Sequence, residues 1–317
     1  MNNLIFSLNA TFPVFFVMLL GYILKNIHML GPSFVKEANT LNFKVTLPAL
    51  LFLDIASADI RSKWDTTYVL FCAIATTIMF FSIWGIAKLV IKDKSTIGAF
   101  VQASFRSSAA VLGVAFIQNM YGDAGMAPLM IIGTVPLFNV YSVIVLTFEA
   151  NTNDSQSPNT HMIKKSVQNI AKNPIIIGIL LGLAVSLLGI KLVPMFEKTV
   201  RSVSALATPL ALLALGAGFE GKKALTKLKP TICASMLKLV VLPAIILPFT
   251  QLFHFEGEKL VALLIMLASP TTVSCYIMAD NMNNDEVLTS SIIVLTTFLS
   301  AFTLTGWIYL LRCFNLI

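Results

Sequence analysis

Three cationic side chains lie inside stretches that are otherwise apolar. Arg106 is ten residues into the stretch 96–120, about 15 Å from its start if the segment is an α-helix. Lys44 and Lys238 lie within two other apolar stretches. A charge near the centre of a bilayer costs several kcal/mol unless a partner compensates it. Each buried cation therefore needs a counter-ion, and a bound anion is one group that provides it.

The three cations differ in how easily they reach water. A lysine can extend its flexible stem to the membrane surface, and we expect Lys238 to reach the cytoplasmic face in this way. For Lys44 the sequence leaves surface exposure and a role in binding equally open. Arg106 is too deep in its stretch to reach water, so we expect it to contact an anion.

Hydroxyl, glycine and proline residues gather in two apolar stretches with the sequences SFRSSAAVLG and ASPTTVS. The candidate binding residues in them are Ser107, Ser108, Gly113, Pro270, Thr271, Thr272 and Ser274. Proline inside a helix removes a backbone hydrogen bond, and hydrocarbon tolerates such a break where it lines a cavity. A helix that begins at the break directs N–H groups at a carboxylate. These segments predict an anion site; alternatively, the hydroxyls bond only to the preceding helical turn.

Acidic residues are expected outside the interior of these stretches. All 15 can be placed in loops or near span ends, and Asp54 and Glu149 come closest to intruding. A cation–proton antiporter would need Asp or Glu at the midplane, so the sequence argues against that class. Sodium coupling stays open, because backbone carbonyl and hydroxyl groups alone can bind sodium.

Membrane-spanning helices must position these residues. The chain has 317 residues, of which 57% are hydrophobic and 12% charged, against about 25% charged residues in a soluble domain. A helix needs about 20 apolar residues to cross a bilayer. Hydropathy predicts ten spans, at residues 5–24, 38–57, 66–91, 96–120, 126–149, 174–190, 199–219, 231–253, 259–280 and 287–311.

The expected fold is an all-α polytopic membrane protein. A polar segment divides the chain into a first five-helix repeat (1–150), a cytoplasmic linker (151–173) and a second five-helix repeat (174–317). Because each half has an odd number of helices, the second half enters the membrane in the opposite orientation. Related halves would form an inverted repeat, in which corresponding broken helices, here 96–120 and 259–280, point to a transport site.

Lysine and arginine residues favour one orientation. Alternate loops carry twelve of them on one side and seven on the other, and positive charge collects in cytoplasmic loops. We therefore expect a multi-pass protein of the cell membrane with both termini outside and the central linker inside. The same bias explains the net charge of +7 without nucleic acid binding. The start MNNLIF lacks the positive charges of a cleavable signal peptide.

Sequence motifs for catalysis and for metal binding are absent. Neither HExxH nor GxSxG occurs, and the segment GAGFEGKK has Lys223 where a phosphate-binding loop requires Ser or Thr. The four cysteines and three histidines are scattered along the chain. We expect no enzymatic activity, no cofactor and no metal ion.

The order and spacing of several segments resemble the auxin efflux carrier family, which includes bacterial malate and malonate permeases. These segments are GYILKN, NFKVTLPALLF, the stretch from Gly113 to NMYG, TPLALLALGAGF, ASP and SSIIVLTTFLSAFTL. The resemblance covers nearly the whole chain. It implies ten helices in an inverted repeat, related to bile-acid symporters and sodium–proton antiporters, with the fourth and ninth helices broken and crossing at the midplane. It also implies a scaffold of the first, second, sixth and seventh helices and a transport domain that moves like an elevator.

The resemblance is imperfect at the residues nearest the expected site. Plant members carry Pro-Asn before a Gly-x-Pro in the fourth helix, and alignment on NMYG puts Ser107 and Ser108 at the Pro-Asn positions and Ala115 at the last proline. Cys275 stands where the ninth helix has a second proline. Ser108 thus replaces the asparagine that the family uses for a carboxylate. These differences argue against auxin as the substrate, and Arg106 would supply the anion contact instead.

We therefore expect a secondary active transporter of a small carboxylate, such as malate or another dicarboxylate, which works by elevator-like alternating access with proton coupling or as a uniporter. Arg106 and the clustered residues would bind the anion, with Lys44 as a second cation. We expect it to bind the carboxylate and the lipid bilayer but no nucleic acid. Formation of a homodimer stays open. Two alternatives are a sodium-coupled organic-anion symporter of bile-acid type and a membrane sensor that binds without transporting.

Overall fold

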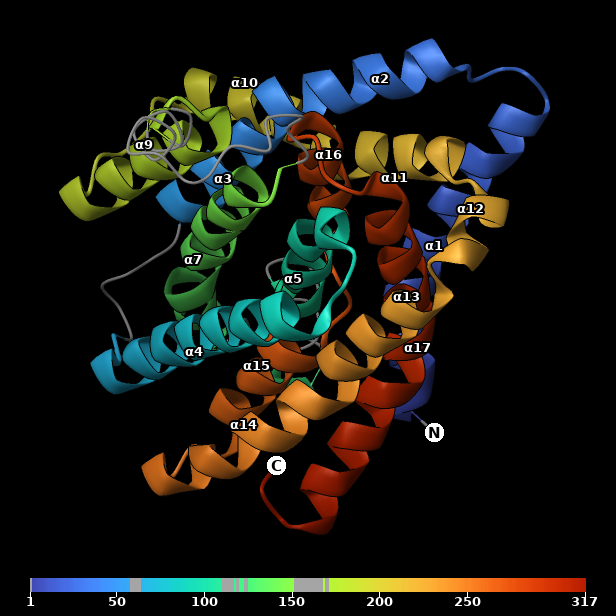
Figure 1. Cartoon of the computed structure of the whole chain (residues 1–317). Helices are drawn as coiled ribbons and strands as arrows, with labels where there is room; N and C mark the ends of the chain where they lie inside the picture. Colours follow the sequence, from blue (N-terminus) through green and yellow to red (C-terminus); the bar gives the residue numbers. More distant parts are fainter. Residues whose placement is uncertain are drawn as a thin grey trace.

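The structure, a computed structural model, is all-helical over the residues that it describes (Figure 1). These are residues 2–57, 64–109, 117, 120–122, 125–150, 168 and 171–317, with side chains from residue 12 onward. No strand occurs among them, which confirms the expected all-α class for this part of the chain.

Irregular helical turns interrupt several of the helices in both halves of the chain. The first half contains α1 (Asn2–Asn26), α2 (Pro32–Leu41), the π-helical η1 (Asn42–Thr46), α3 (Leu47–Ala56), α4 (Thr66–Val90), the 3₁₀-helical η2 (Lys94–Thr96), α5 (Ile97–Phe105) and α7 (Ala127–Phe148). The second contains α9 (Pro174–Leu188), α10 (Pro194–Ser204), α11 (Ala207–Gly218), α12 (Gly221–Thr226), α13 (Leu228–Met236), the π-helical η3 (Leu237–Val241), α14 (Leu242–Thr250), the 3₁₀-helical η4 (Gln251–Phe253), α15 (Gly257–Ala268), α16 (Ser274–Asn281) and α17 (Glu286–Cys313).

Five of the described helical segments are long and apolar enough to cross a membrane. They are Thr66–Val90, Ala127–Phe148, Pro194–Gly218, Leu228–Phe253 and Glu286–Cys313. Two shorter apolar helices cover Phe12–Asn26 and Pro174–Leu188. These helices are consistent with a polytopic membrane protein. The crossings beyond these five remain a prediction.

Acidic side chains cap the beginnings of two long helices. Asp65 accepts a 3.0 Å hydrogen bond from the N–H of Tyr68 at the start of α4, and Asp285 accepts one of 2.8 Å from the N–H of Leu288 at the start of α17. Each bond satisfies an N–H group that the first turn of a helix leaves unpaired. These carboxylates therefore lie at helix ends, as the sequence predicted.

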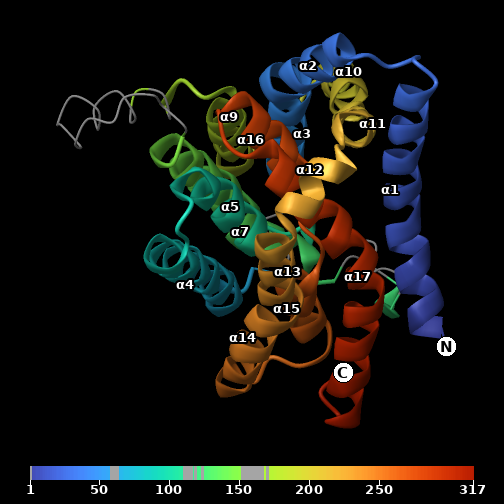
Figure 2. The same ribbon diagram turned by 45° about the vertical axis from the view of Figure 1, so that its right-hand side comes forward.

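Ion pairs lie at both ends of the molecule. Lys259 Nζ is 2.6 Å from Asp65 Oδ2, and Lys227 Nζ is 2.9 Å from Asp285 Oδ2. The first pair lies near the C-terminus, since the N–H of Gly257 donates to the carbonyl of Leu316. The second lies at the far end of the long helix α17. Both chain termini lie in the lower half of Figure 2, at the end that carries the first pair.

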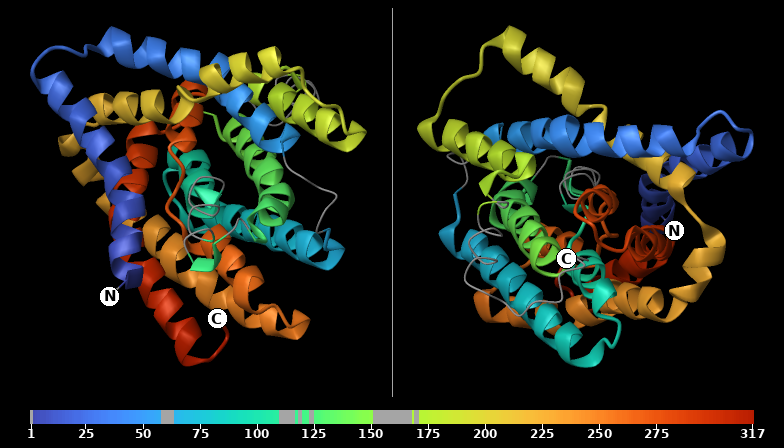
Figure 3. Two further views of the ribbon diagram at one scale, coloured as in Figure 1. Left: turned by 180° about the vertical axis from the view of Figure 1, so that it is seen from behind. Right: turned by 45° about the horizontal axis from the view of Figure 1, so that its top comes forward.

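The helices pack in two groups. In one group α3 packs against α9 and α10, and α11 packs against α1 and α2; Figure 3 shows α2, α3 and α9 along one side of the molecule. In the other group α4, α5 and α7 pack together, and α13, α15 and α16 pack against α17. The two groups also touch where α1 lies beside α17.

Close packing between α1 and α11 depends on a glycine. A Cβ atom placed on Gly216 would collide with the carbonyl oxygen of Met18. Because that obstacle is backbone, a side-chain rotation cannot relieve it. Gly216 therefore allows the two helices to approach at this point.

Candidate functional site

Two helices are interrupted near the middle of the molecule. α5 ends at Phe105, and Arg106 continues in an extended conformation with φ −81° and ψ 138°. α15 ends at Ala268, Ser269 is extended with φ −70° and ψ 157°, and α16 begins at Ser274. These interruptions confirm the breaks expected in 96–120 and 259–280. Gly113 lies outside the described residues, as does the stretch 110–116 around it.

Backbone hydrogen bonds hold the two breaks against each other. The N–H of Ser108 donates to the carbonyl oxygen of Pro270 at 2.9 Å. The hydroxyl of Thr271 donates to the carbonyl of Ala103 at 2.7 Å, and the N–H of Thr271 donates to the hydroxyl of Thr296 on α17 at 3.2 Å. Groups that the broken helices leave unpaired thus find partners in the opposite broken helix or in α17.

Lys238 supplies a further partner for the end of α5. Its side chain is fully buried, and Nζ donates to the carbonyl oxygen of Phe105 at 3.3 Å. The prediction that Lys238 reaches the cytoplasmic surface is therefore wrong. The last carbonyl groups of a helix lack intrahelical partners and carry the negative end of its dipole. An inward ammonium group is stabilised at that position.

Arg106 is held by neutral side chains. Its Nη2 donates a 2.5 Å hydrogen bond to Oδ1 of Asn139, while Nη1 lies 2.7 Å from the sulfur of Met278 and 3.5 Å from the hydroxyl of Ser142. The amide of Asn139 donates to the carbonyl of Val135 at 2.8 Å, which fixes the direction of its oxygen. Arg106 is only 4% exposed, and no ion pair involves it within the described part of the chain.

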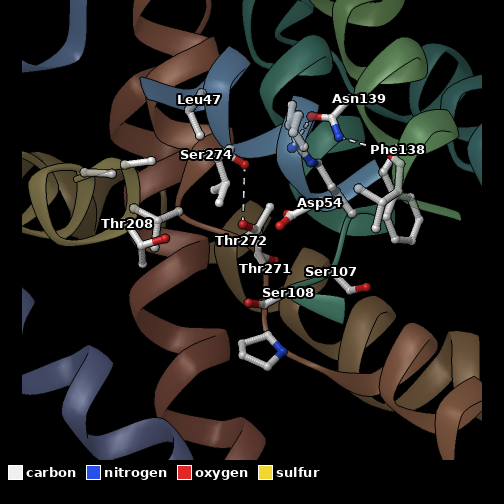
Figure 4. Close-up of a pocket in the computed structure, with 18 of the residues that line it drawn as sticks. Leu47, Asp54, Ser107, Ser108, Phe138, Asn139, Thr208, Thr271, Thr272 and Ser274 are labelled. Carbon is white, nitrogen blue, oxygen red and sulfur yellow. Dashed lines mark hydrogen bonds between the residues drawn. The ribbon is translucent and has the colours of Figure 1, made fainter. Parts of the chain in front are cut away.

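A pocket opens at the breaks (Figure 4). It contains about 1100 Å³ of space, part of which is open to solvent. Seven of the nine residues predicted for the site line it, namely Arg106, Ser107, Ser108, Pro270, Thr271, Thr272 and Ser274. Among the described residues, the buried hydroxyl of Ser107 has no hydrogen-bond partner, so the wall of the pocket holds an unsatisfied polar group.

The pocket lies between the two groups of helices. The side formed by α3, α9 and α11 is apolar apart from Asp54 and Thr208, and the breaks with Asn139 of α7 form the polar side. A guanidinium and several hydroxyls facing apolar residues suit a small ligand with a charged end and a hydrocarbon part.

Two functional candidates were missed in the sequence. Asp54 lines the pocket from the last turn of α3, although it was not among the predicted site residues. It is near a helix end, as predicted, but that end faces the pocket. Asn139 was missed because it follows no motif, although a single Asn within the apolar stretch 126–149 was a usable signal.

Lys44 lies elsewhere. It is exposed in η1 and lines a surface groove with Lys36, Glu37 and Thr40. The structure therefore does not bring Lys44 to the pocket.

The chain is similar to known proteins over almost its whole length. A family model described as membrane transport protein matches residues 6–308. An uncharacterized transporter of Methanocaldococcus jannaschii is 24% identical over 307 residues, which cover 94% of this chain and 97% of the relative. The uncharacterized transporter YfdV of Escherichia coli is 20% identical over 312 residues, 98% of this chain and 99% of the relative.

Proposed function

Because this chain belongs to the membrane transport protein family of auxin efflux carriers, we propose that it is a secondary transporter that carries a small carboxylate across the cell membrane. The family membership makes it a membrane transport protein. The carboxylate, malate or another dicarboxylate, is our proposal for its cargo.

The buried guanidinium of Arg106 is the observation that carries this proposal. It lies in a helix break on the pocket, and its bonded partners Asn139, Ser142 and Met278 are neutral. A desolvated cation without a counter-ion is unfavourable, and a bound carboxylate removes that penalty with charge-assisted hydrogen bonds. The hydroxyls of Ser107, Ser108 and Thr272 would bind the remaining oxygens.

The arrangement of helices supports alternating access. The corresponding breaks in α5 and α15 are what an inverted five-helix repeat would produce. The pocket lies between the group of α1, α3, α9 and α11 and the group that carries the breaks. We propose that the first group is the scaffold and that the second moves past it like an elevator, with both termini outside the cell.

A thermal-shift screen tests the proposal at the level of binding. Purified protein would be heated with a panel of mono- and dicarboxylates, with and without sodium, beside the variant Arg106→Ala. A ligand at about one hundred times its Kd stabilises the folded protein by about 2.7 kcal/mol. The proposal expects a carboxylate to raise the melting temperature of the wild type and not of the variant, in sodium-free buffer. A shift that requires sodium would instead favour a sodium-coupled symporter, and equal shifts in both proteins would contradict the role of Arg106.

A further inference from the structure

The pocket contains a carboxylate as well as a cation. Asp54 lines it from α3, on the scaffold side, while Arg106 lines it from the break. Figure 4 shows the carboxylate of Asp54 directed into the pocket, toward Thr272. Asp54 is half-buried, and no ion pair involves it among the described residues.

A substrate carboxylate changes the charge balance of this pocket. When the pocket is empty, an ionised Asp54 and Arg106 leave its wall without net charge, although no ion pair joins them among the described residues. When a substrate carboxylate binds Arg106, an ionised Asp54 becomes an excess negative charge. Two like charges about 4 Å apart repel by about 4 kcal/mol at the effective dielectric near a protein surface. A proton on Asp54 removes that repulsion and converts the group into a hydrogen-bond donor to the substrate.

Resting on the proposed transport of a carboxylate, we propose that Asp54 is the proton-carrying group of the site: it takes up one proton when substrate binds Arg106 and releases it when the substrate leaves. The proton comes from water on the loading side and returns to water on the other side. No covalent bond to the substrate forms or breaks. Substrate and proton therefore move in the same direction.

Other charged groups packed around α3 are placed differently. α9 carries no titratable side chain. α10 carries Lys198 at the surface and an ion pair of 2.6 Å between Glu197 and Arg201. η1 carries Lys44, which is exposed beside another groove. Among the described residues that line the pocket, Asp54 and Arg106 are the two charged ones.

Transport in proteoliposomes separates the proton step from substrate recognition. Labelled malate would be used in two assays at zero membrane potential: exchange against internal malate, and net uptake driven by an inward gradient of one pH unit. One coupled proton supports about tenfold accumulation in the second assay. We expect the wild type and the control Glu197→Gln, a surface carboxylate on the neighbouring helix α10, to accumulate malate. Asp54→Asn would exchange malate without accumulating it, because its amide does not titrate.

Several results would overturn the inference. Accumulation by Asp54→Asn equal to the wild type would show that another group carries the proton. A folded Asp54→Asn protein that no longer exchanges malate would make Asp54 a binding residue only. If the wild type exchanged alanine faster than malate, Asp54 would instead bind the ammonium group of an amino-acid substrate. If the wild type exchanges no malate, the proposed substrate class fails and this inference falls with it.

A measurement on the wild type alone tests the inference without depending on whether the variant folds. Calorimetric titration of malate in buffers of different ionisation enthalpy reports the number of protons taken up on binding. Near pH 7.5 we expect about one proton per malate bound. Binding without proton uptake would overturn the inference whatever the variant does.

Discussion

Arg106 donates a 2.5 Å hydrogen bond to the side-chain oxygen of Asn139, whose own amide donates to the carbonyl of Val135 one helical turn earlier. The direction of the guanidinium is thus set by the backbone of α7. Asn139→Leu removes this support, and a hydrogen bond to a charged group contributes about 1.5–3 kcal/mol. We expect roughly tenfold or greater loss of carboxylate affinity, measured by thermal shift or calorimetry.

The variant Asn139→Asp sharpens this prediction. Its carboxylate would pair with Arg106 and compete with the substrate, so binding should fall below that of Asn139→Leu. Undiminished binding by Asn139→Asp would mean that the substrate does not bind at Arg106.

Lys238 stabilises the end of α5. Lys238→Met keeps the apolar stem but leaves the carbonyl of Phe105 without its partner, and an unpaired buried acceptor costs about 1–3 kcal/mol. We expect a lower melting temperature in detergent. Leu239→Met, at the buried neighbouring position, is the matched control and should change stability by less than about 1.5 kcal/mol. A Lys238→Met protein as stable as this control would contradict the bond.

Gly216 allows α1 and α11 to approach. Gly216→Ala places a methyl group against the carbonyl of Met18, and such overpacking costs about 1–3 kcal/mol. Gly306→Ala in α17 meets no atom within 4 Å and should be neutral or slightly stabilising, because alanine favours helices. Thermal denaturation of both variants checks the contrast, and equal melting temperatures would refute it.

The ion pair between Lys259 and Asp65 gives stability a pH dependence. The hydrogen bond from Lys259 is the main cause that lowers the pKa of Asp65 from its ordinary value. Because the folded pKa is the lower one, the stabilisation is present above about pH 4 and is lost as the pH falls through the folded pKa. The pair is partly exposed, so its contribution is within about 1 kcal/mol.

Asp65→Asn isolates this pair, since Asn also caps helices well. We expect the variant to melt below the wild type at neutral pH and the difference to shrink as the pH falls below the ordinary Asp pKa near 4. Salt at about 1 M should shrink the difference. If the difference in melting temperature grew in acid, the stabilising role of the ionised Asp65 would be contradicted.

The breaks could be predicted from the sequence because their causes are local. Pro270 lacks an N–H group, and hydroxyl residues surround both interruptions, so the residue types alone disfavour an unbroken helix. Seven of the nine predicted site residues then meet in one pocket. The two segments meet through the hydrogen bond between Ser108 and Pro270. The sequence pattern of either segment alone does not predict this bond.

The directions of long side chains could not be predicted in this way. Lys238 and Lys44 are both lysines in apolar stretches, yet one is fully buried and the other exposed. The difference depends on where the end of α5 lies, which is a tertiary relationship. Asp54 illustrates the same limit, because its position near a helix end was clear while the direction in which that end faces was not.

The central claim is tested most directly by the exchange of labelled malate in proteoliposomes. These would contain the wild type, Arg106→Ala or Arg106→Lys. Loss of a charge-assisted hydrogen bond of about 1.5–3 kcal/mol corresponds to roughly a ten- to hundredfold loss of affinity. We predict that the wild type exchanges malate, that Arg106→Ala loses at least about tenfold at low malate concentration, and that Arg106→Lys falls between them. Exchange by folded Arg106→Ala at the wild-type rate would contradict the account.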